Sequence, residues 1–107
     1  MEFLYAVRAE TLNEANALIE QTLRVQLTGG EGLHNGGEYF HFRQPNYSLQ
    51  LRENIDLDDT ELEFNGMHEP EFPEFKWLLY VWANAIPQDV AAALAVAHET
   101  FVRLRNK

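Results

Sequence analysis

Residues 74–84, EFKWLLYVWAN, most constrain the fold because they form the strongest predicted strand in the chain. Its alternating positions are apolar on both sides: Phe75, Trp77, Leu79 and Val81 on one, and Leu78, Tyr80 and Trp82 on the other. A strand of this kind lies at the centre of its sheet, or has its second face covered by another part of the chain. Other parts of the chain must therefore pack against both faces of this strand.

The rest of the sequence predicts two helices, three more strands and one long loop. Thr11 and Glu14 have the spacing of a capping box, which opens a helix. Residues 27–37, LTGGEGLHNGG, contain five glycines and predict a flexible loop. Pro87 favours a second helix start, and apolar residues at spacings of three and four predict that this helix continues to the C-terminus. The expected order is strand 2–9, helix 12–24, strand 37–44, strand 47–54, strand 74–84 and a helix from Pro87 onward.

These elements predict a single α+β domain over residues 1–107, with the order βαβββα. Each helix has one apolar stripe, so both can be buried on one face of a mostly antiparallel four-stranded sheet. The other face would present Leu78, Tyr80 and Trp82. That is too much aromatic area to leave in water without a reason, unless the connection at residues 55–73 folds over it.

The connection before the central strand holds all of the net charge, which is −9 for the whole chain. Residues 53–74 contain nine acids and no Lys or Arg, whereas the remaining sequence has eight acids and eight bases. The nine acids are Glu53, Asp56, Asp58, Asp59, Glu61, Glu63, Glu69, Glu71 and Glu74. A segregated excess of this kind creates a local negative potential that attracts cationic surfaces.

Apolar residues recur throughout this acidic stretch, which a disordered acidic tail would not have. They are Ile55, Leu57, Leu62, Phe64, Met67, Phe72 and Phe75. We expect them to attach the segment to the body of the domain and to hold its carboxylates outward, as a structured acidic ridge. A solvated acidic loop without a binding role is the alternative.

Several catalytic and metal-binding patterns are incomplete. Asp56-Leu57-Asp58-Asp59-Thr60 matches the D-x-D-x-T pattern of aspartyl-phosphate phosphotransferases, but no buried apolar strand precedes it. The same segment lacks the glycine of an EF-hand loop. The four histidines have no i, i+4 pair, and the chain has no cysteine. We therefore expect no specific metal site, no cofactor and no catalytic residue, with a small metal-dependent hydrolase as a weaker alternative.

Nucleic acid and membranes are disfavoured as direct partners. Tyr39, Tyr80 and Trp82 could stack on bases, but a domain with this negative charge repels phosphates. The longest apolar run, residues 77–83, is too short to span a bilayer. The N-terminus has no basic region followed by a long apolar run, so we expect no signal peptide and a cytoplasmic protein.

The segments GGEYFHF and EFPEFKWLLYVWAN, in a small acidic α+β chain without cysteine, give a family-level likeness. The chain resembles the immunity proteins of bacterial contact-dependent growth inhibition and other polymorphic toxin systems. The likeness extends over most of the chain in size, charge and element order. It implies a cytoplasmic inhibitor that binds one toxin domain, often a nuclease, and blocks its active site or substrate groove.

The charge pattern agrees with that implication, because nuclease sites are cationic in order to hold phosphate. We expect a monomer in a 1:1 complex, with Asp56, Asp58, Asp59, Glu61 and Glu63 at the charged core of the interface. Glu69, Glu71 and Glu74 would extend it, and Trp77, Tyr80 or Trp82 would be aromatic anchors if exposed. A generic protein-interaction or oligomer subunit with a solvated acidic loop is the alternative function.

Overall fold

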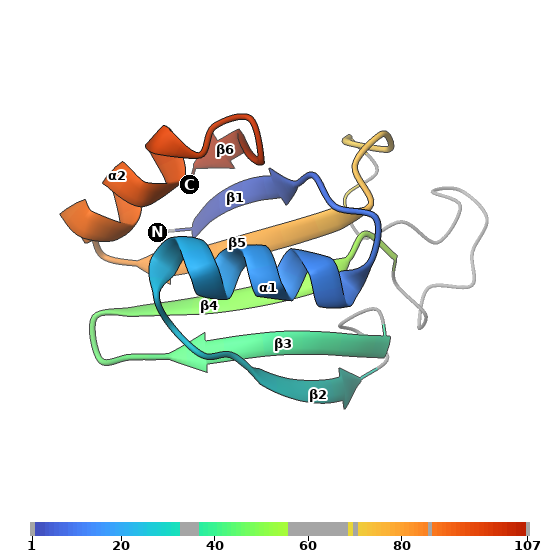
Figure 1. The fold of residues 1–107 in the computed structure, drawn as a ribbon, viewed down its shortest axis with the longest axis horizontal. Coiled ribbons are helices and arrows are strands. Elements are labelled where there is room, and N and C mark those ends of the chain that lie inside the picture. The colour runs from blue at the N-terminus through green and yellow to red at the C-terminus, as the bar shows by residue number, and fades with distance from the viewer. Residues whose placement is uncertain (1, 33–36, 56–68, 70, 86, 107) are drawn as a thin grey trace.

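The computed structural model describes residues 2–32, 37–55, 69, 71–85 and 87–106. Among these residues the fold is α+β, with two helices and a six-stranded antiparallel sheet (Figure 1). The elements are β1 (Glu2–Val7), α1 (Leu12–Leu23), β2 (Thr28–Gly32), β3 (Gly37–Arg43), β4 (Tyr47–Glu53), β5 (Trp77–Ala83), α2 (Gln88–Val96) and β6 (Phe101–Asn106). The strands lie side by side in the order β2-β3-β4-β5-β1-β6. The α+β class is confirmed, whereas the predicted four strands and the order βαβββα are wrong.

β5 lies inside the sheet, between β4 and β1, as its two apolar faces predicted. Leu79 pairs with Leu51 of β4 and with Tyr5 of β1, so the ladder is continuous on both sides of β5. β3 and β4 pair as a hairpin, which is closed by a hydrogen bond from the Gln44 N–H to the Tyr47 carbonyl at 2.8 Å.

Both helices cover the same face of the sheet, in front of the strands in Figure 1. Ala15 and Ile19 of α1, with Val90 and Leu94 of α2, bury their side chains against the odd-numbered residues of β1, β4 and β5. The predicted capping box starts α1: the Glu14 N–H donates to Thr11 Oγ1 at 3.0 Å. This face holds the larger of the two apolar clusters among the described residues.

The first missed strand, β2, lies in the glycine-rich segment that was predicted to be a loop. It pairs with β3, and Gly30 lies opposite Tyr39. A Cβ at Gly30 would come within 2.8 Å of the Tyr39 ring, so the ring occupies the space that a side chain would need. Glycine here permits close contact between an aromatic ring and the edge strand, although it removes the alternation by which strands are recognised.

The second missed strand, β6, replaces the end of the predicted C-terminal helix. α2 ends at Val96, and Phe101–Asn106 pairs with the free edge of β1. The pairing shifts by one residue, because Tyr5 lies opposite Arg103 while Leu4 lies opposite Arg105. Phe101 joins the helix-side cluster and Leu104 joins the cluster on the opposite face, as residues three apart in a strand do. The shift instead places Arg105 opposite Leu4, on the face away from the helices. The three-residue spacing of these two apolar side chains predicted a helix, but the two lie on opposite faces of a strand.

Candidate functional site

The acid-rich segment, residues 53–74, leaves the sheet at the end of β4 and returns to it before β5. The structure describes Glu53–Ile55, Glu69 and residues 71–74 of it. The predicted charged core, Asp56, Asp58, Asp59, Glu61 and Glu63, lies outside the described residues. The site is therefore built from the points at which this segment is attached to the domain. Glu69 with residues 71–75 is called the strap below.

Asn54 joins the two ends of the undescribed stretch 56–68. Its Nδ2 group donates to the carbonyls of Glu69, Phe72 and Phe75 at 3.2, 3.1 and 3.1 Å, and its Oδ1 accepts from the Glu69 N–H at 2.7 Å. The Asn54 side chain is buried, so these bonds replace water that it has lost. Residues 55 and 69 are consequently held close together, and the acidic stretch leaves and re-enters the domain at one place.

Arg52 holds the chain where it leaves β4. The residue is 2% exposed, and its Nη2 group donates to the Ile55 carbonyl at 2.6 Å. Its Nε group donates to the Glu53 carbonyl at 3.3 Å. This guanidinium thus fixes the backbone of the first residues of the acidic segment.

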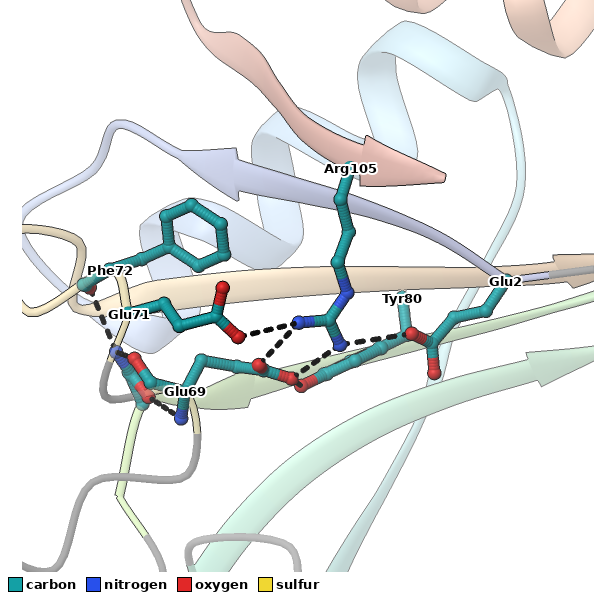
Figure 2. A network of polar contacts seen from close by, with 7 residues as sticks. Glu2, Glu69, Glu71, Phe72, Tyr80 and Arg105 are labelled. Atoms are coloured by element: carbon teal, nitrogen blue, oxygen red, sulfur yellow. Dashed lines mark hydrogen bonds and ion pairs between the residues drawn. The ribbon is translucent and has the colours of Figure 1, made fainter. Parts of the chain in front are cut away.

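Glu69 forms the polar centre of the strap (Figure 2). Its carboxylate accepts two hydrogen bonds from Arg105, at 2.7 Å from Nη1 to Oε1 and 2.8 Å from Nη2 to Oε2. The Tyr80 hydroxyl donates to Glu69 Oε2 at 2.5 Å. Arg105 Nη2 also donates to Glu2 at 3.0 Å, and Arg105 Nη1 lies 3.8 Å from the Glu71 carboxylate. The strap, β1, β5 and β6 therefore meet at one guanidinium–carboxylate pair.

This arrangement perturbs the titration of the two partners of Glu69. Burial raises the pKa of Tyr80 far above its usual value, and the hydrogen bond to Glu69 adds to the rise. The hydrogen bond to Glu69 also raises the pKa of Arg105, against the opposing effect of burial. Tyr80 therefore stays protonated as a donor and Arg105 stays charged around neutral pH.

Apolar contacts complete the attachment of the strap. Phe72 and Phe75 pack against a buried cluster of Leu4, Leu78 and Tyr80 on the sheet face away from the helices. The prediction that these two phenylalanines attach the acidic segment to the domain is confirmed. The second face of β5 is thus covered in part by the strap.

Other predicted site residues occupy different environments. Glu69 was expected to hold its carboxylate outward, which is wrong because Glu69 is 7% exposed and paired with Arg105. The Glu71 side chain is 73% exposed, and Glu74 is exposed. Their roles in binding a partner stay predictions.

The three predicted aromatic anchors also differ in burial. Trp77 is buried on the helix side, where its Nε1 donates to the Ala9 carbonyl at 2.9 Å, and Tyr80 is buried under the strap. Trp82 is 39% exposed and stacks on Tyr80 with an angle of 7° between the rings. Of the three, Trp82 alone meets the condition of exposure that an anchor requires.

Trp82 borders the part of this face that the strap does not cover. It lines a hollow of about 480 Å³ together with side chains from β3 and β4, which include Tyr39, His41, Arg43, Ser48 and Gln50. Tyr39 and His41 have ring centroids 5.8 Å apart. The outer face of the sheet is therefore apolar and closed under the strap, and aromatic and polar beyond it.

Sequence reasoning missed two residues that organise the site. Arg105 falls within the helix predicted from Pro87 to the C-terminus, but it lies on β6 and is the partner of Glu69. Asn54 received no role, and a lone asparagine at a strand end has no pattern that would reveal one. Both act through contacts with residues 15 or more positions away.

Among the described residues, no group of three His, Cys, Asp or Glu side chains is placed to hold a metal ion. His41 lies on β3 and His98 follows α2, whereas His34 and His68 lie outside the described residues. Neither helix in the described part has the length and hydropathy needed to cross a membrane.

The chain was also compared with known proteins. No protein-family model, curated protein or solved structure gives a significant match to it.

Proposed function

We propose that this chain is a cytoplasmic immunity protein that binds and neutralises the toxin domain of a contact-dependent growth inhibition or related polymorphic toxin system. A nuclease is the best-fitting class of toxin, because its substrate groove is cationic. The acidic segment would occupy that groove or cover the active site, and the chain itself would catalyse nothing. Binding would be 1:1.

The attachment of both ends of the acidic stretch 56–68 carries this proposal. Asn54 bonds to three carbonyls and one N–H of the strap, and Glu69 bonds to Arg105 and Tyr80. Five carboxylates lie in the sequence between these fixed ends. Fixing the ends of a loop lowers the entropy lost when it binds, so the carboxylates are better prepared to meet a basic partner. A loop that served only solubility would need no such attachment.

Ion pairs within the chain reduce the number of carboxylates that are available to a partner. Glu69 and Glu2 share Arg105, so the three groups together carry one net negative charge instead of two. Glu74 and the exposed Glu71 side chain lie on the strap and can extend an interface. Trp82, next to the 480 Å³ hollow, is the best-placed aromatic anchor for the same partner.

Charge reversal tests the proposal. The partner would be the C-terminal domain of the protein encoded immediately upstream, and the readouts would be survival of cells producing it and association kinetics. A triple variant, Asp58→Lys, Asp59→Lys and Glu61→Lys, should bind at least about 100-fold more weakly at low salt, mostly through a slower on-rate. The loss should shrink as salt rises.

A matched control separates local charge from total charge. Glu10→Lys, Glu31→Lys and Glu38→Lys reverse three exposed acids outside the segment and give the same net charge, −3. Binding by this variant should stay close to that of the native chain. Equal losses in the two triple variants, or no protection of cells by the native chain, would contradict the proposal.

An attachment variant tests the role of the fixed ends without changing charge. Asn54→Ala removes the bonds to the strap, and it should weaken binding while the acidic residues stay in place. The remaining fold can be followed by circular dichroism and thermal unfolding. Native affinity in a folded Asn54→Ala variant would show that attachment is irrelevant to binding.

A further inference from the structure

A second site lies on the helix side of the sheet, opposite the strap. Here α2, β1 and β6 enclose a groove of about 620 Å³, within the usual range for small-molecule sites. Its walls include the buried side chains of Phe3, Tyr5, Leu94 and Phe101. The groove is therefore mostly apolar, and all of its lining residues except His98 belong to a helix or a strand.

Small side chains on α2 keep the groove open. Ala91 and Ala95 line it one helical turn apart, where larger residues would fill it. The outward side of the same helix is also apolar, with Ala92 exposed and Val96 84% exposed. A surface helix normally presents polar residues to water, so this helix lacks the pattern of one that is only solvated.

The groove is also lined by a cationic group and by groups that can form hydrogen bonds. Arg103 lies opposite Tyr5 in the pairing of β1 with β6, and its guanidinium lies 5.6 Å from the centre of the Phe3 ring. His98 also lines the groove. No Asp or Glu is among the described residues that line it, and none of the described carboxylates forms an ion pair with Arg103.

Tyr5 supports the same interpretation. Burial raises the pKa of its hydroxyl, and the nearby charge of Arg103 opposes the rise. The hydroxyl is thus a neutral donor beside a cation, at the edge of an apolar space. Such a set of groups is complementary to a ligand with an apolar body and one anionic end.

We propose that this groove binds a monocarboxylate with an unbranched apolar chain, of the fatty-acid class. The chain would lie on Phe3, Leu94 and Phe101 beside the two alanines, and the carboxylate would lie next to Arg103. This site is distinct from the acidic segment, and it does not depend on the function proposed for that segment.

Titration of the full-length protein with decanoate, below its micelle concentration, tests the site by isothermal calorimetry and amide NMR shifts. Decan-1-ol and acetate are the matched probes for the chain and the carboxylate alone. We expect saturable 1:1 binding of decanoate, with shifts on α2, β1 and β6, and no saturable binding of acetate. Absence of saturable decanoate binding would overturn the proposal.

Two helix variants locate the ligand. Ala95→Leu fills the groove and should weaken decanoate binding about tenfold, as expected for displacement of one or two methylene groups. Ala92→Leu places the same side chain on the exposed side of α2, outside the groove, and should leave binding unchanged. Equal affinities of the two variants would refute this location.

A third variant tests the anionic end. Arg103→Gln should weaken decanoate binding about three- to fivefold, the size of a solvent-exposed charge interaction, and should not affect decanol. Equal effects on decanoate and decanol would overturn the assignment of the carboxylate to Arg103. If instead a second copy of the chain closes the groove, the native protein will sediment as a dimer, Ala95→Leu will dissociate it and decanoate will not bind, which would also refute the proposal.

Discussion

The two faces of the sheet are held by different kinds of interaction. On the helix side, α1 and α2 bury a large apolar cluster that includes Leu49, Leu79 and Val81. On the other side, the described apolar cluster is small, and the strap is held by the bonds of Asn54, Glu69 and Arg105. Apolar burial stabilises without strict geometry, whereas these polar bonds specify one position of the strap. This difference indicates that the helix side supplies most of the folding stability, whereas the strap side determines where the acidic segment is attached to the sheet.

The largest expected effect is on the helix side. Leu79 is fully buried in the larger cluster, and Leu79→Ala should lower the free energy of unfolding by about 3 kcal/mol through lost burial and a residual cavity. Urea unfolding measures this loss. Amide hydrogen exchange in the strap should speed up only as much as the lower free energy of global unfolding predicts. Selective opening of the strap in this variant would contradict the separation of the two faces.

A smaller and more local loss is expected on the strap side. Glu69→Ala leaves the Tyr80 hydroxyl and the Arg105 guanidinium without their carboxylate, and should cost about 2 kcal/mol, because Arg105 is partly exposed and water replaces some of the bonds. The amide of Phe72 should exchange faster than the core amides, since the strap detaches first. Glu74→Ala removes an exposed acid from the same strap and should change stability by less than about 0.5 kcal/mol.

A double-mutant cycle of Glu69→Ala with Arg105→Ala then isolates their interaction. The two losses should be clearly less than additive, because either variant alone breaks the same pair. Additive losses would mean that the pair contributes nothing specific to the attachment of the strap.

The last effect is absent at neutral pH and appears only at alkaline pH. The pKa of Tyr80 is higher in the folded than in the unfolded state, whose tyrosines titrate near pH 10. At a pH between the unfolded and the folded pKa of Tyr80, only the unfolded state loses the proton. The contribution of Tyr80 to the free energy of unfolding is therefore complete below pH 10. It falls by about 1.4 kcal/mol per pH unit as the pH rises above 10. Denaturant unfolding from pH 9 to 12 should show a shallower decline for Tyr80→Phe than for the native chain. Tyr5 and Tyr47 also have raised pKa values, so some decline should remain. Identical slopes would contradict the burial of a protonated Tyr80.

Much of the fold was predictable because local patterns and final structure agree. The apolar faces of β5 and the Thr11–Glu14 capping box each predicted the correct element, and the strand predicted at 47–54 corresponds to β4. The two failures have specific causes. β2 is rich in glycine and has no alternation to recognise, and Phe101 and Leu104 of β6 have a spacing that continues the apolar pattern of the preceding helix.

The candidate site was predictable in composition but not in arrangement. The concentration of acids in residues 53–74, and their attachment through Phe72 and Phe75, follow from the order of residues along the chain. The inward direction of Glu69 does not, because its partner Arg105 is 36 residues away and on a strand that was mistaken for a helix.

The sequence by itself determined the α+β class, the central place of β5 and the segregation of negative charge, since these depend on composition and local periodicity. Only the tertiary structure decided which carboxylate pairs internally, which aromatic ring stays exposed and where the acidic segment is attached. Those outcomes depend on groups such as Asn54, Arg105 and Tyr80, which are distant in sequence and meet only when the sheet is assembled.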